Sequence, residues 1–563
     1  MSEEEGSGDN LTAKSMAVRF AIMLTASAGA GMLGHYSGAL DFKQATSCGV
    51  FLAIIMGTLF FWNFRLAIAF LGLSVLIFTN SLNIARFVTS SSLEVILFLV
   101  GMMIIVGALR DLGFFTWVVQ LIVSMPNISG RKFIACTAAA SALLACAVDE
   151  VTSIIFISTL IFQVCDRLKL NPLPYVMICV LATNVGSAGT MMGNPVGIFI
   201  GTKAGLTFGD FMTWAFPLMI VALAATIAFT MFHFRRDLHL FDRHLQERLA
   251  KNLSLAPVVE VPYLQGVILL VATIGVIASH HQLEQLFGLE KNSILLIAPL
   301  ICSGLVMIIR HNRARHYVEK EVDWWTLLFF MLLFAVAGTV QFTGVDKVMA
   351  NFFTGVAGTG HATLVPFILS VSAVGSAFVD NVIFVAAFSP VIEQLSQTLK
   401  DLPLWWALLF GACFGGNITM IGSTANIVAL GMLERKSHIH VNFFQWLKVG
   451  FLSALLATAI AWAGLMVLTP LMPDRYTQLS SAALDAGTDM RFDNKKITAV
   501  GRAENGRLRL ESEHQAFNVT LEAGDLEVPQ GLRAFRGVMN GDPESGYRLT
   551  VDQIMTREEA KAN

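Results

Sequence analysis

The stretch LLACAVDEVTSIIF, from Leu143 to Phe156, places two adjacent carboxylates and a threonine hydroxyl inside an apolar run. A second apolar run follows, LATNVGSAGTMMGNPVGIFIG from Leu181 to Gly201, and it is interrupted by Gly, Asn, Thr and Pro. The same pair of features returns later in the chain. VGSAFVDNVIFVAAFSPVI spans Val374 to Ile392, and FGACFGGNITMIGSTANIVALG spans Phe410 to Gly431.

The two copies keep their register. Asp149 and Asp380 are separated by 231 residues (380 − 149 = 231), and Thr190 and Thr419 by 229 (419 − 190 = 229). Weak internal symmetry, with polar helix-breaking residues at matching membrane positions, is typical of the substrate site of inverted-repeat secondary transporters. The duplication therefore predicts a transporter.

Composition places the chain in a membrane. Hydrophobic residues make up 55% of it and charged residues 14%, with a mean hydropathy of +0.65, whereas soluble domains are about a quarter charged. The 38 Lys and Arg balance 40 Asp and Glu, which argues against a nucleic-acid partner. We therefore expect a multi-pass protein of the cell membrane, surrounded by lipid.

Apolar runs long enough to cross a bilayer, about 20 residues of helix, occur throughout the first 470 residues. The predicted crossings are 16–34, 44–62, 64–80, 93–112, 174–201, 211–234, 263–280, 294–310, 324–343, 405–430 and 446–470. Two further stretches, 131–165 and 361–398, are too long for one helix and are polar near their middles. Each is predicted to be a re-entrant hairpin with Asp149 or Asp380 at its tip, because backbone can break at membrane depth only where protein or a wet cavity covers it.

Loop charge predicts the orientation. Lys and Arg concentrate after Phe232 and after Ile309, which places those loops in the cytoplasm by the positive-inside rule. About eleven crossings then put the N-terminus in the cytoplasm and the C-terminus outside. The two hairpins open toward opposite sides, as an inverted repeat requires.

These features divide the chain into six parts. They are a flexible tail (1–15), N-terminal scaffold helices (16–90), a first repeat (91–234), a cytoplasmic linker with connecting helices (235–320), a second, inverted repeat (321–472) and a small soluble domain (473–563). In the last part, KKITAV, GRLRLES, AFNVTLEA and GYRLTV alternate in polarity between turn signals, which predicts a small β-rich domain. This domain carries no metal, nucleotide or nucleophile motif. It is interpreted as a stabilising or dimer-contacting appendage, or else as a regulatory or ligand-binding domain.

Ionisable residues at membrane depth are costly and normally pair, bind an ion or carry protons, and glycines and prolines free backbone groups that can coordinate ions. The predicted binding residues are Asp149, Glu150, Thr152, Asn184, Gly186, Thr190, Gly193, Asn194 and Pro195 in the first copy, and Asp380, Asn381, Gly416, Asn417, Thr419, Gly422, Ser423, Thr424 and Asn426 in the second. Asp149, Glu150 and Asp380 are the candidate ligands of sodium or another cation. No other cofactor is expected.

These residues can also be interpreted as purely structural, without a role in binding. Small residues and Ser or Thr also permit close helix packing in membranes, and an Asp at a hairpin tip can simply cap a helix. A binding site is favoured because both copies combine an Asp in an apolar run with a polar helix break, in the same register. Arg110 and the loop histidines, among them His244 and His280, are interpreted as solvated interface residues. Most tryptophans, including Trp324, Trp325, Trp405, Trp406 and Trp446, are interpreted as interface anchors.

The segments Arg131–Pro217, with its AVDEVTS tip, and Val371–Gly431, with FVDN and GGNITMIGSTANIVALG, resemble a known group. It is the arsenite permease, NhaD-type sodium/proton antiporter and melanosomal P protein branch of the ion transporter superfamily, which also holds the divalent anion/sodium symporters. The resemblance covers about 90–470. It implies a scaffold with a moving transport domain, elevator-type alternation and a homodimer.

The expected fold is thus an all-α polytopic membrane protein: an elevator-type inverted-repeat transporter with two re-entrant hairpins and two broken helices, plus the C-terminal β domain. The acidic tips predict cation coupling, with exchange of sodium or another small cation for protons as the leading hypothesis. The alternatives are arsenite efflux, organic-anion or dicarboxylate transport with sodium or protons, and, in another class, an ion channel. The sequence contains no HExxH or GxSxG constellation, so an enzyme is not expected.

Overall fold

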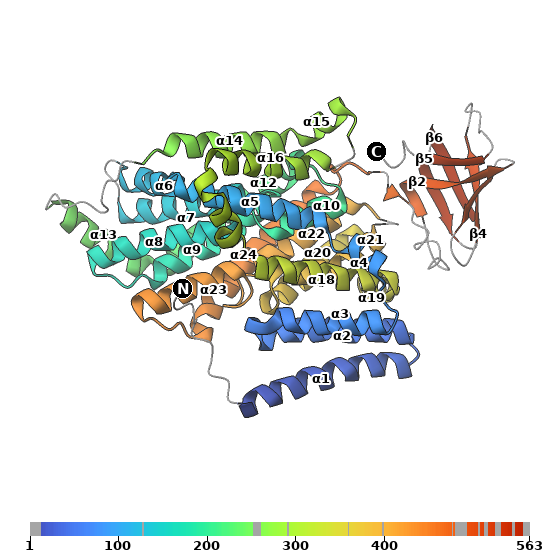
Figure 1. Ribbon diagram of the computed structural model, residues 1–563, viewed down its shortest axis with the longest axis horizontal. Helices are drawn as coiled ribbons and strands as arrows, with labels where there is room; N and C mark the ends of the chain where they lie inside the picture. The colour runs from blue at the N-terminus through green and yellow to red at the C-terminus, as the bar shows by residue number, and fades with distance from the viewer. Residues whose placement is uncertain are drawn as a thin grey trace.

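The computed structural model describes most of the chain. The described residues are 13–125, 129–250, 261–289, 292–358, 360–396, 399–475, 477–478, 492–504, 507–511, 516–523, 531–542 and 546–555. Most of the predicted tail, 1–15, lies outside them, and the first helix already begins at Ala13. Helices occupy the chain as far as Leu468, and strands form a separate sheet after it (Figure 1).

The first half of the chain builds the scaffold helices and the first repeat. Its helices are α1 (Ala13–Tyr36), α2 (Phe42–Phe60), α3 (Arg65–Phe78), α4 (Ile84–Ser90), α5 (Leu93–Asp111), α6 (Phe114–Val123), α7 (Gly130–Ala147), α8 (Glu150–Leu168), α9 (Leu173–Gly186), α10 (Pro195–Ala204), α11 (Phe208–Asp210) and α12 (Phe216–His233). Short 3-10 turns, η1 (Trp62–Phe64) and η2 (Ser187–Gly189), precede α3 and follow α9.

The connecting helices and the second repeat follow. They are α13 (Arg235–Ala250), α14 (Tyr263–Ala278), α15 (His280–Phe287), α16 (Ser293–Ile309), α17 (Ala314–His316), α18 (Trp324–Phe342), α19 (Val345–Ala357), α20 (His361–Phe378), α21 (Asn381–Leu395), α22 (Asp401–Gly415), α23 (Thr424–Ser437) and α24 (Phe443–Leu468).

Length and composition agree with a polytopic protein. Among the described residues, nine helices are long and apolar enough to cross a membrane, or up to eleven if each of two bent pairs is one span. Three hairpin arms, α7, α8 and α20, are themselves that long. A re-entrant path for the hairpins therefore stays a prediction.

The two repeats match helix for helix. Gly113 and Gly344, again 231 residues apart, have φ of +73° and +78° and start α6 and α19. This left-handed conformation favours glycine, because a Cβ atom would be strained there. The short helices α6 and α19 were not predicted, since neither is long enough to register as a crossing.

Both hairpins turn at the expected aspartates. Asp149 is the N-cap of α8 and accepts a hydrogen bond from the Thr152 backbone N–H at 2.8 Å. Asp380 is the N-cap of α21 and accepts from the Val382 backbone N–H at 3.0 Å. An Asp side chain satisfies a helix N-terminal donor that the helix itself leaves free, so each residue ends one arm and starts the next.

Both broken helices are also present, and close packing explains their small residues. A Cβ atom on Gly186 would clash with the backbone of Ala142, and one on Gly415 would clash with the backbone of Ala373. Membrane helices approach this closely only where small residues allow it. The contact therefore holds α9 against α7 and α22 against α20 in the same way.

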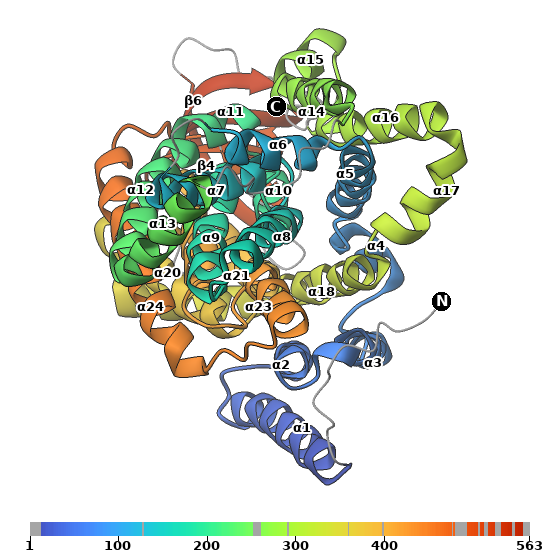
Figure 2. The ribbon, with the colours of Figure 1, turned by 90° about the vertical axis from the view of Figure 1, so that its left-hand side faces the viewer.

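The helices form two bodies, which Figure 2 separates. We call α7–α10, α12 and α20–α24 the repeat body, in which α7 packs on α9, α20 on α22, and α24 on α12. We call α1–α5, α14, α16 and α18 the outer body, in which α2 packs on α3, α3 on α18 and α5 on α16. Helix α18 also packs on α21 and so joins the two.

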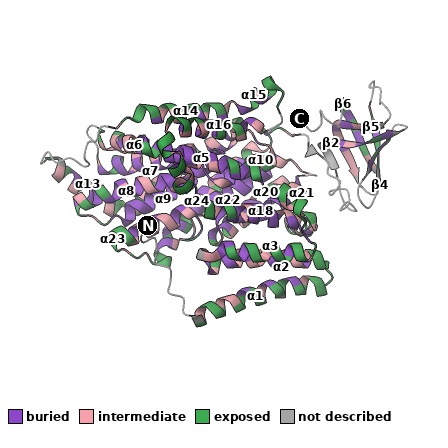
Figure 3. Ribbon diagram, viewed as in Figure 1, coloured by how far each residue is buried: buried purple, intermediate pink, exposed green. Residues whose placement is uncertain are grey.

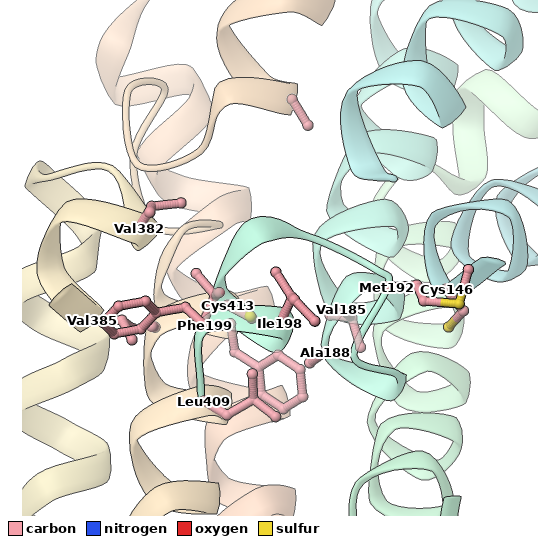
Figure 4. Packing of buried hydrophobic residues seen from close by; sticks show 14 of the residues in the cluster. Cys146, Val185, Ala188, Met192, Ile198, Phe199, Val382, Val385, Leu409 and Cys413 are labelled. Atoms are coloured by element: carbon pink, nitrogen blue, oxygen red, sulfur yellow. The ribbon is translucent and has the colours of Figure 1, made fainter. Parts of the chain in front are cut away.

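The repeat body is the better buried of the two (Figure 3). Every residue of α9 is buried, and so is every residue of α22 after Asp401. Figure 4 shows side chains of both repeats around the first break, including Val185 and Phe199 from the first and Leu409 and Cys413 from the second. Trp405, Trp406 and Trp446 belong to this core, so their interpretation as interface anchors is wrong.

The C-terminal domain is β-rich, as predicted. Its strands are β1 (Thr477–Gln478), β2 (Phe492–Glu504), β3 (Arg507–Glu511), β4 (Ala516–Glu522), β5 (Gly531–Asp542) and β6 (Gly546–Met555). The sheet order is β1-β2-β3-β4-β6-β5, and β5 also pairs with β2. The five strands β2–β6 therefore close into a small barrel around apolar side chains such as Ile497, Phe535 and Leu549. None of the four alternating segments in the sequence predicts β5.

Candidate functional site

A cavity of about 470 Å³ lies between the two bodies. Its outer-body wall comes from η1, α3, α5 and the start of α18, and includes Trp62, Arg65, Arg110 and Thr326. Its other wall comes from the hairpin tips and helix breaks of both repeats. Ligand sites of this size typically hold a small molecule with a few placed polar groups.

The predicted residues divide between this wall and the protein behind it. Those that line the cavity are Asp149, Glu150, Thr152, Asn194, Pro195, Asp380, Asn381 and Thr424. The others, Asn184, Gly186, Thr190, Gly193, Gly416, Asn417, Thr419, Gly422, Ser423 and Asn426, are not among the lining residues. The structure thus brings both tips to one cavity, and Asp149 and Asp380 share it.

Four helix N-termini meet at this cavity. Asp149, Asn194, Asp380 and Ser423 are the N-caps of α8, α10, α21 and α23, and each accepts a backbone hydrogen bond through its side chain. Helix N-termini carry a partial positive charge that stabilises anions. The helix N-termini therefore offset part of the negative charge that the two tip aspartates bring to the cavity.

Glu150 is a buried carboxylate in the wall of the cavity. It is only 5% exposed. Its Oε1 accepts a long hydrogen bond from the Ser423 hydroxyl at 3.4 Å, while its Oε2 is buried without a hydrogen-bond partner among the described residues. A buried carboxylate with an unpartnered oxygen is costly. A proton or a cation at this oxygen would remove that cost.

Behind the cavity, buried amides join the two repeats. The Asn184 side-chain nitrogen donates to the side-chain oxygens of Asn417 at 2.7 Å and Asn426 at 2.8 Å. Its side-chain oxygen lies 3.0 Å from the Ser423 hydroxyl, whose single hydrogen it shares with Glu150 Oε1. Asn426 in turn donates to the carbonyl oxygens of Gly416 and Thr419. These residues stabilise the broken backbone, and Ser423 connects them to Glu150.

The paired threonines make matching contacts. The Thr190 hydroxyl donates to the carbonyl oxygen of Cys146, three residues before the first tip, and the Thr419 hydroxyl donates to that of Ala377, three residues before the second. The register seen in the sequence is therefore a structural equivalence. Each threonine fixes a helix break to the hairpin of its own repeat.

Two glycines and one amide complete the predicted set. A Cβ on Gly193 would meet the backbone of Ser187, and one on Gly422 would meet that of Gly416. With its amide nitrogen facing acceptors, Asn381 donates to the carbonyl oxygens of Gly422 at 2.8 Å and Ala412 at 3.1 Å. These residues shape the turns at the cavity and leave few polar atoms free.

Sequence reasoning missed Arg65. This side chain is 5% exposed, lies 3.8 Å over the Trp62 ring and donates to the Thr326 hydroxyl at 3.2 Å. Its Nε has no hydrogen-bond partner among the described residues. A buried cation within an apolar run is itself a signal of function in a membrane protein, but Arg65 stands at the start of a predicted crossing, where an arginine is ordinary.

Arg110 is exposed, with 43% of its side chain accessible, in keeping with its interpretation as a solvated residue. It lines the cavity and forms an ion pair with Glu321 at 3.0 Å. A linear pattern does not reveal that α5 brings this exposed side chain to the cavity. His280, in contrast, is buried, so its interpretation as a solvated residue is wrong. His244 contacts the end of α8 at the Leu168 carbonyl oxygen.

The cavity does not resemble a multi-ligand metal centre. Among the residues that the structure describes, no three His, Cys, Asp or Glu side chains lie close enough together to hold a metal ion. A cation bound here would use one carboxylate together with hydroxyl or backbone oxygens. Sodium binding by Asp149, Glu150 or Asp380 stays a prediction.

Comparison with known proteins agrees with this architecture. A family model described as a citrate transporter, CitMHS, matches residues 50–411. An uncharacterized transporter of Mycobacterium bovis is 32% identical over 375 residues, which cover 65% of this chain and 84% of that protein. The P protein of Mus musculus is 25% identical over 450 residues, 66% of this chain and 53% of that protein.

Among solved structures, the YdaH transporter of Alcanivorax borkumensis aligns with a TM-score of 0.46 at 15% identity, covering 71% of this chain and 89% of that one. The resemblance to the superfamily that contains the P protein is confirmed by the matched relatives. Since the family model spans more than half of the sequence, the chain is a membrane transporter that belongs to the citrate transporter family, CitMHS.

Proposed function

We propose that the protein is a secondary active transporter that exchanges sodium, or another small cation, for protons by alternating access. The observation that carries this proposal is Glu150, a buried carboxylate at the cavity with one unpartnered oxygen. Burial favours the neutral, protonated form of such a group, and a bound cation would favour its charged form. Proton and cation would therefore compete for one side chain.

The charge of the cavity supports a cation as cargo. Five carboxylates line it, those of Asp149, Glu150, Glu321, Asp323 and Asp380, against the guanidinium groups of Arg65 and Arg110. The helix N-termini offset part of this negative charge. The remaining excess attracts small cations and repels a free anion.

The position of the cavity supports the alternating step. One wall belongs to the repeat body and the other to the outer body, so a displacement of one body against the other would carry Asp149, Glu150 and Asp380 past Arg65. Such a displacement is an elevator movement, with the outer body as scaffold. We also infer a homodimer, with the N-terminus in the cytoplasm and the β domain outside.

A second candidate is transport of a small carboxylate anion together with sodium or protons. The N-termini of α10 and α23 at the cavity and the two arginines favour an anion. The matching family model is described as a citrate transporter. The coupling cation would then neutralise the tip carboxylates. Arsenite efflux and a passive channel are alternatives that no feature of the cavity favours.

Flux measurements in proteoliposomes test the proposal. With an imposed pH gradient, we expect sodium uptake that collapses when the gradient is abolished. Citrate, smaller dicarboxylates and arsenite, each with and without sodium, form the other arms. Flux that ignores both sodium and the pH gradient would refute cation coupling, and unsaturable conductance in planar bilayers would indicate a channel.

A further inference from the structure

The open ends of the two hairpins are equivalent positions. Helix α7 begins at Gly130 and α20 at His361, and α8 ends at Leu168, for which the equivalent residue is Leu399. Both pairs keep the offset of 231 (361 − 130 = 231; 399 − 168 = 231). In an inverted repeat these two ends face opposite sides of the protein.

In the first repeat, helix α13 closes this end. Asp242 accepts a hydrogen bond from the Gly130 backbone N–H at 2.7 Å, and His244 Nδ1 lies 2.9 Å from the carbonyl oxygen of Leu168. The buried ring of Phe241 stacks on Phe133, with ring centroids 5.6 Å apart. One helix thus holds the start of α7 and the end of α8 together.

In the second repeat, the equivalent carbonyl contacts the β domain. Lys495, on β2, donates to the carbonyl oxygen of Leu399 at 2.6 Å. Its side chain is 2% exposed and lies 3.6 Å from the Asp474 carboxylate. Burial lowers the pKa of the Lys495 ammonium group. A barrel gains little stability by burying a lysine. The burial of Lys495 is therefore explained by its contacts with Leu399 and Asp474.

The segment that leads to the barrel makes further contacts at the same end. Arg475 forms an ion pair with Asp401 at the start of α22 and donates to the carbonyl oxygens of Ala204 at 3.0 Å and Gly205 at 3.2 Å, at the end of α10. Lys400 donates to the carbonyl oxygen of Met472 at 3.1 Å. Arg475 therefore bridges the two repeats beside the hairpin end.

Figure 1 draws α13 and the β sheet at opposite ends of the helical part. We propose that the C-terminal β domain anchors the α21 end of the second hairpin, whereas α13 anchors both arms of the first, and so fixes Asp380 at the cavity through α21. Helix α21 has 15 residues, a length of about 22 Å. A hairpin whose arms are held at one end presents a better fixed tip at the other.

Hydrogen–deuterium exchange of the full-length protein in detergent tests the proposal without reference to any cargo. In Lys495→Met, we expect amide exchange in residues 399–406 to rise about tenfold, because a buried contact is lost and local opening becomes easier, while exchange in α7 and α8 stays unchanged. Arg475→Met should also raise amide exchange in residues 399–406. Lys495→Arg, which retains a cationic donor, should restore most of the protection.

The reciprocal variant and a surface control complete the design. His244→Ala should raise exchange at the end of α8 and leave residues 399–406 unchanged. Arg502→Met alters an exposed side chain on the same strand as Lys495 and should alter neither hairpin. Wild-type protection of residues 399–406 in both Lys495→Met and Arg475→Met would overturn the proposal, as would an equal loss of protection in both hairpins.

Discussion

The side-chain nitrogen of Asn184 lies 2.8 Å from the side-chain oxygen of Asn426, so the broken helices of the two repeats are joined by a direct, fully buried hydrogen bond. Asn184 also contacts Asn417 and Ser423. Removing a buried amide leaves its partners desolvated and unpaired, which costs about 1–3 kcal/mol for each group. This contact therefore stabilises the site as a whole.

Asn184→Ala should accordingly lower the melting temperature of the purified protein by several degrees and reduce transport. Thermal unfolding in detergent, followed by intrinsic fluorescence, measures the loss. Asn351→Ala, on the exposed surface of α19, is the matched control and should melt like the wild type. Equal melting temperatures in the two variants would show that the amide network contributes little.

Glu150→Gln should abolish the pH dependence of transport and lower its rate at least about tenfold, because an amide neither releases a proton nor binds a cation by charge. The reason is the unpartnered Oε2 at the cavity. The rate is measured in proteoliposomes between pH 5.5 and 8.5. Glu434→Gln, on an exposed part of α23, controls for the substitution, and an unchanged pH profile in Glu150→Gln would exclude this residue as the coupling group.

Asp149→Asn and Asp380→Asn should fold but fail to couple. Asn caps a helix about as well as Asp, so the hydrogen bonds to Thr152 and Val382 can persist while one negative charge is lost. We expect unchanged thermal stability together with loss of cation-driven flux. Wild-type flux in both variants would remove these carboxylates from the site.

Arg65→Met separates the two candidate cargoes. For a cation, loss of the guanidinium removes a repulsive charge from the cavity wall, and the KM for sodium should fall about fivefold, equivalent to about 1 kcal/mol. For a carboxylate, the same change should raise the KM for the anion by a similar factor or more. Arg65→Lys, which keeps the charge, should shift either KM much less.

Gly415→Ala should destabilise the protein by about 1–3 kcal/mol, since the added Cβ would overlap the backbone of Ala373 in a well-packed region. Gly431→Ala is the control, because nothing lies within 4 Å of a Cβ at that helical position and Ala is the better helix former there. Denaturation midpoints compare the two. Similar midpoints would show that α22 and α20 can move apart at little cost.

Much of this protein follows from its sequence alone. Hydropathy identifies the membrane helices, because crossing a bilayer needs a long apolar segment whatever surrounds it. The aspartates at the hairpin turns are local signals too, since capping depends on neighbouring backbone. So are Gly193 and Gly422, which approach the backbone of Ser187 and Gly416, nearby in the chain. The repeat register then relates Thr190 to Thr419, which make equivalent contacts.

Only the tertiary structure decides which of these residues face the cavity. Thr424 lines it whereas Asn184 and Asn426 lie behind it, and Arg65 and Arg110 reach it from α3 and α5, outside the duplicated hairpin and break motifs. Lys495 reaches Leu399 from a domain nearly a hundred residues further along the chain. These are contacts between distant segments, set by how helices and barrel pack in three dimensions, and hydropathy and spacing along the chain carry no information about that packing.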